Sequence, residues 1–433
     1  MKKRLALQAL ILLALIGCSQ QPQIQADFGT RPFKACSTVY ASYPAPESEL
    51  TPPPAGYEPF CISHYGRHGS RRVIGNNYYS KVGDILRAGK DAGVLSAKGE
   101  DLLIRIDEMD LEHRDRSGGL TILGHEQHRG IAERMFRNFS EVFKGNTTIQ
   151  ARSSTVIRCI LSMQEATARL GQLNTNLNIV TDASAADMVY ITSSNDNGVW
   201  LDEITAKCEA VREKFQSENL DASRLLGDLF TDKEWAAANI DGPEFMNDMF
   251  NFQAGQQCLE YESDVTFDDI LNEEELKACS RMHTLWWYTL HCESYAPFRQ
   301  RSLLKNFLST ADTCMSSPRK NVVLRYGHDS CLLPLCALLE TNDAAQQYDS
   351  YDQMLECWNE TDYIPMAGNI QLIFYRSRTA GAPILVKALL NEKEAKLPAE
   401  TDIFPYYEWD GLASYYKAKI KNFELNILPE LNL

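Results

Sequence analysis

The segment that most constrains the fold is Phe60–Arg72, which reads FCISHYGRHGSRR. It begins as a short apolar run and then reaches glycine, a pattern typical of a buried strand that ends in a turn. The turn carries His68 between Arg67 and Arg71. Neighbouring cations disfavour a protonated imidazole, so we expect the pKa of His68 to be lowered and the side chain to be neutral. A neutral histidine is a nucleophile and guanidinium groups fit phosphate oxygens, so the turn predicts phosphoryl chemistry.

A second turn with similar side chains lies much later in the chain. The run NVVLRY, residues 321–326, predicts a strand, and His328 and Asp329 follow it before an apolar helix. Arg158 lies near the start of another predicted helix, for which Thr155 is a possible N-cap. Backbone N–H groups at a helix start favour anions. In an open parallel α/β sheet these turns would meet at the carboxyl edge, where ligands bind.

These residues can divide the work of phosphate monoester hydrolysis, which needs a barrier lowering on the order of 20 kcal/mol. We expect His68 to attack phosphorus and form a phosphohistidine. We expect Asp329 to protonate the leaving group and then to deprotonate water. The non-bridging oxygens would be held by Arg67, Arg71, Arg158 and His328. The scheme requires no metal ion or other cofactor.

The two turns resemble those of the histidine phosphatase superfamily, specifically its acid phosphatase and phytase branch, which includes the multiple inositol polyphosphate phosphatases. The RHGxR signature of that family is matched by Arg67, His68, Gly69 and Arg71, and its later His-Asp pair by His328 and Asp329. A weaker R-x-x-x-S element resembles Arg158 and Ser162, and PMAGNIQLIFY is similar to the segment before the family's late strands. The resemblance runs from about Tyr57 to Leu390, with the helical middle matched by character more than by residue.

The resemblance implies an α/β fold with a mostly parallel sheet flanked by helices and an inserted α-helical cap domain. It also implies phytate or a related inositol polyphosphate as the substrate. Two positions depart from the family. Arg72 and the residues after it stand where acid phosphatases usually have proline, and Asp329-Ser330 stands where inositol polyphosphate phosphatases often have Ala-Glu. The acid is therefore of the Asp type, and the subfamily is left open.

The chain divides into segments of different character. Residues 1–17 have a basic start and an apolar stretch, as in a signal peptide, and Leu15–Cys18 resembles the lipobox of bacterial lipoproteins. An ordinary cleaved signal or a short membrane anchor is the alternative. We expect a lipidated tether and extended lead-in over 18–56, the phosphatase core over 57–194 and 300–433, and a helical cap insertion over 195–299. The expected location is the periplasmic or cell-surface side of a membrane, anchored through a lipid on Cys18.

Charge narrows the class of ligand. The net charge is −15, and it becomes about −18 without the three basic residues of the leader. Nucleic acid is therefore not an expected partner, since binding it requires a basic face. An anionic small molecule would need a local positive site. Four other cations either extend that site or lie on the surface: Arg72, Lys81, Arg87 and Arg134.

Several weaker patterns have structural explanations. His125 and His128 are three residues apart, whereas a metalloprotease zinc helix needs a spacing of four, so we expect structural roles. If Cys18 is lipidated, eleven cysteines remain and at least one thiol is free.

Two other functions remain open: a broad acid phosphatase for sugar or nucleotide monophosphates, and a non-catalytic lipoprotein that binds phosphorylated ligands. The oligomeric state is also open.

Overall fold

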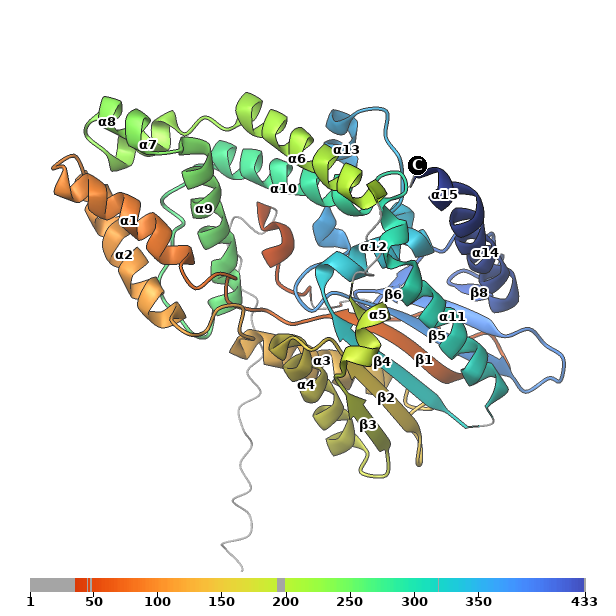
Figure 1. Ribbon diagram of the computed structural model, residues 1–433. Coiled ribbons are helices and arrows are strands. Elements are labelled where there is room, and N and C mark those ends of the chain that lie inside the picture. The colour runs from red at the N-terminus through yellow and green to blue at the C-terminus, as the bar shows by residue number, and fades with distance from the viewer. Residues whose placement is uncertain (1–35, 45, 47–48, 193–198, 318, 432–433) are drawn as a thin grey trace, which may run out of the picture. The chain divides into compact units, whose positions relative to one another are not determined.

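The computed structural model describes residues 36–431, except 45, 47–48, 193–198 and 318. The predicted signal peptide and the first part of the predicted tether lie outside the described residues. The described residues belong to one compact unit, which is an α/β fold as predicted (Figure 1). Its strands are β1 (Tyr57–Arg67), β2 (Thr148–Ser153), β3 (Asn178–Asp182), β4 (Asn321–Gly327), β5 (Asn369–Ser377), β6 (Leu385–Leu390), β7 (Lys393–Ala395) and β8 (Tyr406–Glu408).

The strands form one mixed sheet with β1 near its middle. The order is β3-β2-β4-β1-β5-β6-β7, and β8 pairs with β6. From β3 to β1 the strands are parallel, whereas β5 to β8 pair antiparallel. β5 and β6 form a hairpin. In the β1–β4 pair, Arg67 lies opposite Gly327. The two predicted turns therefore leave the same edge of the sheet from neighbouring strands.

Side chains alternate between the two faces of these strands. On one face Ile62 and Leu324 belong to a buried core that includes side chains of α3 (Ile122–Asn138) and α4 (Ile157–Leu173). On the other face Arg325 of β4 points at α11 (Arg301–Ser316), where its Nε donates to Asn306 at 2.7 Å. Its guanidinium carbon lies 4.2 Å from the centroid of the Phe307 ring. Helices thus cover both faces, and the two predicted turns stay at an edge.

A helical region lies beside the sheet. It contains α6 (Val199–Asn219), α7 (Ser223–Leu229), α8 (Lys233–Asn239), α9 (Gly242–Gly255) and α10 (Glu273–His291), and no strand occurs among the described residues from 188 to 300. The remaining helices are α1 (Tyr78–Asp91), α2 (Ala97–His113), α5 (Met188–Ile191), α12 (Asp329–Leu339), α13 (Tyr351–Cys357), α14 (Trp409–Asn422) and α15 (Leu428–Leu431). Short 3₁₀ helices include η2 (Thr38–Tyr40), η4 (Gln256–Leu259), η5 (Ala296–Gln300) and η7 (Glu360–Asp362).

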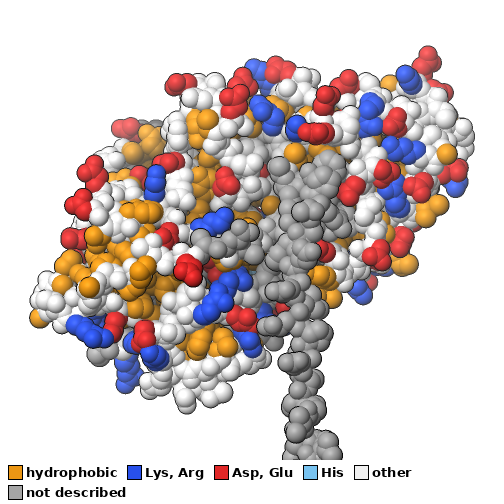
Figure 2. Space-filling view, turned by 180° about the vertical axis from the view of Figure 1, so that it is seen from behind, with side chains coloured by type: hydrophobic (Ala, Val, Ile, Leu, Met, Phe, Trp, Pro, Cys, Tyr) orange, Lys and Arg blue, Asp and Glu red, His pale blue; other side chains and the backbone are white. Residues whose placement is uncertain are grey.

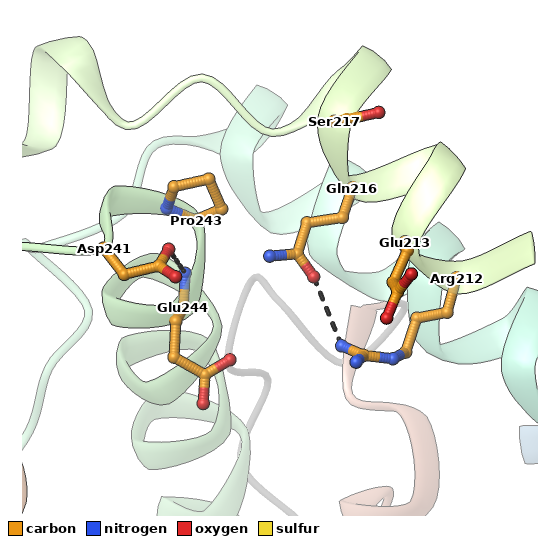
Figure 3. Close-up of a pocket in the computed structure, with 7 residues that line it drawn as sticks. All are labelled: Arg212, Glu213, Gln216, Ser217, Asp241, Pro243 and Glu244. Atoms are coloured by element: carbon orange, nitrogen blue, oxygen red, sulfur yellow. Dashed lines mark hydrogen bonds between the residues drawn. The ribbon is translucent and has the colours of Figure 1, made fainter. Parts of the chain in front are cut away.

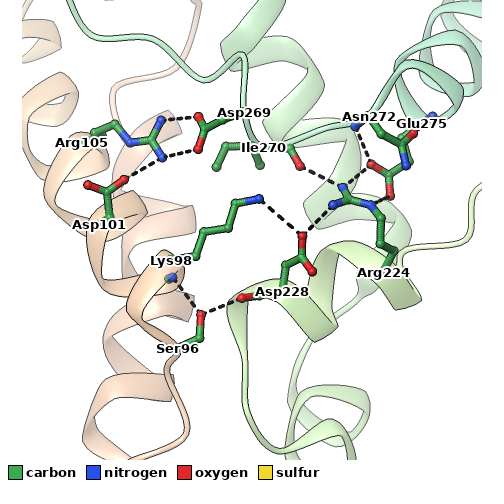
Figure 4. A network of polar contacts seen from close by, with 11 residues as sticks. Ser96, Lys98, Asp101, Arg105, Arg224, Asp228, Asp269, Ile270, Asn272 and Glu275 are labelled. Carbon is green, nitrogen blue, oxygen red and sulfur yellow. Dashed lines mark hydrogen bonds and ion pairs between the residues drawn. The ribbon is translucent and has the colours of Figure 1, made fainter.

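The hairpin of α1 and α2 packs with this helical region, although the sequence placed it within the 57–194 core segment (Figure 1). Figure 4 shows the polar contacts that join them. Arg105 of α2 forms an ion pair with Asp269 at 2.7 Å, and the Ser96 hydroxyl donates to the backbone carbonyl of Asp228 at 2.6 Å. These contacts attach α2 to α7 and to the segment before α10.

The folded part begins before Tyr57, where the sequence placed its start. Val39, Tyr40 and Tyr43 are all at most 8% exposed. The prediction was wrong here because residues 19–56 are rich in Gln, Pro and Ser, and three scattered apolar side chains give no periodic signal. The sequence from Ser37 to Tyr43 is part of the globular unit.

Figure 2 shows acidic and basic side chains interspersed over one face of the molecule. Within the described part of the chain, none of the helices combines the length and the apolar character of a membrane span. The eleven cysteines in that part form no disulfide bond with one another, and most of them, including Cys61, Cys159 and Cys331, are buried.

Candidate active site

The structure brings all six predicted site residues to one edge of the sheet. Arg67 is the last residue of β1, and His68 follows it. Asp329 is the first residue of α12, with His328 at its N-cap after β4. Arg158 is the second residue of α4, which follows β2. The rings of His68 and His328 lie 5.8 Å apart between centroids. The three parallel strands β2, β4 and β1 therefore supply the site together.

His68 is buried and its ring is oriented by the backbone. The backbone N–H of His68 donates to Gly327 O at 3.0 Å, which links the two turns. The ring Nδ1 lies 2.9 Å from Gly69 O. A carbonyl oxygen only accepts, so Nδ1 carries the proton and the lone pair is on Nε2. Burial lowers the pKa of His68 well below its ordinary value, and Arg67, Arg158 and Arg71 lower it further. The imidazole is neutral, as predicted.

Gly69 allows the turn to pack directly on helix α3. A Cβ at this position would lie 2.4 Å from the carbonyl oxygen of Gly124, which is far inside van der Waals contact. The Gly69 N–H donates to the Ser162 hydroxyl at 3.1 Å, and that hydroxyl donates to Arg158 O at 2.8 Å. The glycine of RHGxR and the serine of R-x-x-x-S therefore fix the turn to α3 and α4.

Arg67 is fully buried and held from three sides. Its Nη1 donates to Val39 O at 2.7 Å and to Ile364 O at 2.6 Å. Its Nη2 forms an ion pair with Asp329 at 2.7 Å. Burial lowers the pKa of Arg67, and the Asp329 carboxylate opposes this effect. The guanidinium is a fixed positive group that also orients Asp329.

Arg71 and Arg158 have no carboxylate within ion-pair distance among the described residues. Arg71 donates to Arg72 O at 3.1 Å, and its guanidinium lies over the Tyr40 ring at 5.3 Å. The buried Nε of Arg158 has no hydrogen-bond partner in the described part of the chain. Burial lowers the pKa of Arg158, and the charge of Arg71 lowers it further. Both side chains keep N–H groups that an anion can use.

His328 and Asp329 complete the site. The Ser154 hydroxyl lies 3.1 Å from His328 Nε2. Burial lowers the pKa of His328 to about 4; Asp329 opposes this effect, and Arg158 adds to it. Burial raises the pKa of Asp329, but Arg67 and Arg71 outweigh it and hold that pKa below its ordinary value. Three guanidiniums thus face one carboxylate and two neutral imidazoles, an arrangement suited to an anion with two negative charges.

The four cations that the sequence left undecided each pair with a carboxylate. The pairs are Arg72 with Glu262 at 2.5 Å, Lys81 with Glu244 at 3.1 Å, Arg87 with Asp107 at 2.6 Å and Arg134 with Glu392 at 2.7 Å. Their charges are therefore largely neutralised within the protein. They do not add unpaired positive charge to that of Arg71 and Arg158.

The two histidines of GHEQH have structural surroundings. His125 Nδ1 lies 2.9 Å from Glu165. His128 is buried with its ring 5.5 Å from that of Tyr326. Among the described residues no group of His, Cys, Asp and Glu has the arrangement of a metal site.

Sequence reasoning missed several residues that support the site. Ser154 directly follows β2, and its contact with His328 depends on the order of the strands. Val39 and Tyr40 gave no signal, because they lie in the segment taken as a lead-in. The predicted N-cap was also wrong by one residue: α4 has Val156 at its N-cap, with no side-chain hydrogen bond, in place of Thr155.

A separate hollow lies between α6 and α9 (Figure 3). It is lined by Arg212, Glu213, Gln216, Ser217, Asp241, Pro243 and Glu244, and by none of the predicted site residues. Three of these side chains are acidic and one is basic, so the hollow is unsuited to a phosphate.

Comparison with known proteins gives matches only among solved structures: no family model matches the chain, and no curated protein does. A multiple inositol polyphosphate phosphatase of Bifidobacterium longum, in complex with inositol hexasulfate, matches with a TM-score of 0.72 and 19% identity over 89% of this chain and 98% of that one. A phytase from D. castellii matches with a TM-score of 0.63 and 14% identity, covering 92% of this chain and 89% of that one. Hafnia alvei phytase matches with a TM-score of 0.52 and 12% identity over 88% of this chain and 100% of that one. The chain therefore has the histidine phosphatase fold of these enzymes.

Proposed function

We propose that this protein is a phosphomonoesterase that acts through a phosphohistidine on His68. The observation that carries the proposal is the state of the His68 ring. Nδ1–H is bound to Gly69 O, and three guanidiniums surround a buried, neutral imidazole. A protein that only captured phosphate would gain nothing from a neutral nucleophile opposite Asp329.

In the first step Nε2 of His68 attacks phosphorus. The N–P bond forms while the bond from phosphorus to the ester oxygen breaks, and the leaving oxygen takes a proton from Asp329. Arg71, Arg158 and His328 stabilise the charge on the non-bridging oxygens. Arg67 orients Asp329 through their ion pair.

The electrostatics of the site explain how Asp329 acquires the proton. Without ligand, Arg67 and Arg71 hold the pKa of this carboxyl low, so it is ionised. A phosphate dianion offsets the charge of the guanidiniums and therefore raises that pKa. Substrate binding and protonation of the acid are thus coupled.

In the second step a water molecule attacks the phosphohistidine. Asp329, now ionised, takes a proton from the water as the O–P bond forms and the N–P bond breaks. Inorganic phosphate leaves, and His68 returns to its neutral state. Both steps balance without a metal ion or a redox group.

The proposed substrates are phytate and related inositol polyphosphates. The support is the match to structures of an inositol polyphosphate phosphatase determined with inositol hexasulfate and with phosphate. One observation favours the second candidate, a broad acid phosphatase. The four cations that would bind additional phosphates are already paired with carboxylates.

We also propose that the protein is exported and anchored through a lipid on Cys18, because Leu15–Cys18 resembles a lipobox. Labelling of cells with a palmitate analogue tests this proposal. The native chain should take up the label and a Cys18→Ser variant should not. Equal labelling of both chains would contradict lipidation at Cys18.

Rapid quenching in alkaline detergent with ³²P-labelled substrate tests the mechanism. The native protein should yield an acid-labile, base-stable phosphoprotein, and His68→Ala should abolish both the label and turnover. His125→Ala is the matched control, because this histidine contacts Glu165 outside the site. Full activity of His68→Ala would refute the mechanism. Product analysis on phytate beside p-nitrophenyl, glucose and adenosine monophosphates distinguishes the two candidate substrate classes.

A further inference from the structure

The segment Ser37–Tyr43, which we name the N-terminal strap, is fixed at both ends. At its start the Gln257 side-chain amide donates to the Ser37 hydroxyl at 2.6 Å. At its end the Tyr43 hydroxyl donates to Glu392 at 3.0 Å. Thr38 has a φ of 48°, a conformation that β-branched residues rarely adopt. Such a conformation persists only where the surroundings impose it.

Between these two anchors the strap contacts both arginines of the RHGxR turn. Val39 O accepts from Arg67 at 2.7 Å. The ring of Tyr40 lies 5.3 Å from the guanidinium carbon of Arg71. Tyr40 is 8% exposed and Arg71 is 7% exposed, so the two side chains cover one another.

We propose that Tyr40 is a positioning residue, which holds Arg71 in the orientation that binds the non-bridging oxygens of a phosphoryl group. The inference rests on the proposed function and adds the strap to the active site. No sequence motif marks Tyr40, since it lies well before the RHGxR signature.

Arg71 needs such support because little else restrains it. In the described part of the chain its guanidinium donates to the neighbouring carbonyl of Arg72 and lies over the Tyr40 ring, and no carboxylate there forms an ion pair with it. Burial lowers the pKa of Arg71, but the neighbouring Tyr40 and Asp329 outweigh this effect and hold that pKa above its ordinary value. An arginine side chain has many rotamers, and a displacement of about 1 Å at a reacting centre can cost 10²-fold in rate.

Affinity for inorganic phosphate is the direct readout, measured by titration calorimetry on the full chain and as a competitive inhibition constant against p-nitrophenyl phosphate. Tyr40→Leu should weaken phosphate binding by about 3- to 30-fold and raise KM more than it lowers kcat. Tyr40→Phe keeps the ring and should recover most of the affinity. Tyr261→Leu is the control, because that tyrosine is 39% exposed. Affinity within twofold of native for Tyr40→Leu, or no recovery in Tyr40→Phe, would overturn the inference.

A double-mutant cycle separates positioning from a general effect on folding. In an Arg71→Met background, Tyr40→Leu should cause no further loss of phosphate affinity. An equal loss in both backgrounds would show that Tyr40 does not act through Arg71. If Tyr40→Leu does not fold, Tyr40→Met, whose longer and more flexible side chain adapts to the space left by the ring, takes its place in the cycle. Calorimetry does not depend on turnover. A native protein that binds phosphate without hydrolysing esters would refute the proposed function and leave this test intact.

Discussion

Replacement of Arg158 by methionine should separate activity from stability. Arg158 has a buried Nε without a partner and no carboxylate within ion-pair distance in the described part of the chain. Removal of one preorganised donor to a transition-state oxyanion costs about 2.7–4 kcal/mol, which is about 10²–10³ in kcat/KM. No protein contact of comparable strength is lost. The free energy of unfolding should therefore change by less than about 0.5 kcal/mol, and relief of repulsion from Arg71 acts in the stabilising direction.

Arg67→Met provides the contrast. This change removes hydrogen bonds to Val39 O and Ile364 O and leaves Asp329 without its ion-pair partner. Loss of one member of a buried ion pair destabilises by about 3–5 kcal/mol. Both variants should lose activity, but only Arg67→Met should lose much stability.

The assays are kcat/KM on p-nitrophenyl phosphate and urea unfolding followed by tryptophan fluorescence. Arg114→Met is the control, because that side chain is 65% exposed and makes only a long ion pair with Asp110. Two results would refute the reasoning: equal destabilisation of the Arg158 and Arg67 variants, or a kcat/KM within about fivefold of native for Arg158→Met.

Three further predictions follow from the geometry of the site. The pKa of His68 is lowered and that of His328 is about 4, so both rings stay neutral when the pH falls below the ordinary histidine pKa of about 6.5. On acidification kcat/KM should therefore show no decrease with an apparent pKa near 6.5. A pH–rate profile with such a decrease would contradict the neutral state of the two rings. Asp329→Asn should slow hydrolysis of esters with poor leaving groups by about 10²–10⁴-fold and hydrolysis of aryl phosphates much less, measured as kcat/KM on glucose phosphate and p-nitrophenyl phosphate. Equal losses on the two substrates would exclude Asp329 as the general acid. Gly69→Ala should lower the free energy of unfolding by about 1–3 kcal/mol and abolish most activity, because the added Cβ would lie 2.4 Å from Gly124 O. Urea unfolding like that of the native protein would refute this close contact.

The sequence predicts the parts of the site that depend on local pattern. Apolar runs that reach Gly66 and Gly327 mark β1 and β4, and the histidines come just after them: His68 follows Arg67 at the end of β1, and His328 follows Gly327. Parallel pairing of the two strands then brings the turns together. Contacts that depend on tertiary packing were not predictable. The Ser154–His328 contact requires β2 beside β4, and Arg67 reaches Val39 through a segment without periodicity.

The pairing of distant charges could not be read from the sequence either. Arg72 and Glu262 are far apart along the chain, and only the packing of the helical region on the RHGxR turn makes them partners. The packing of α1 and α2 against the helical region was not predictable for the same reason. Arg105 and Asp269 are distant in the sequence and meet only in the folded protein.

The position of β1 in the sheet has a consequence for biosynthesis. Its parallel partner β4 begins only at Asn321, and its antiparallel partner β5 only at Asn369. A nascent chain therefore carries His68 early but lacks His328, Asp329 and both neighbours of β1 until most of the protein has been made. Such long-range pairing folds slowly and depends on late contacts. A fragment that ends before β4 would thus have His68 without an acid, so hydrolytic competence arises only with a nearly complete chain.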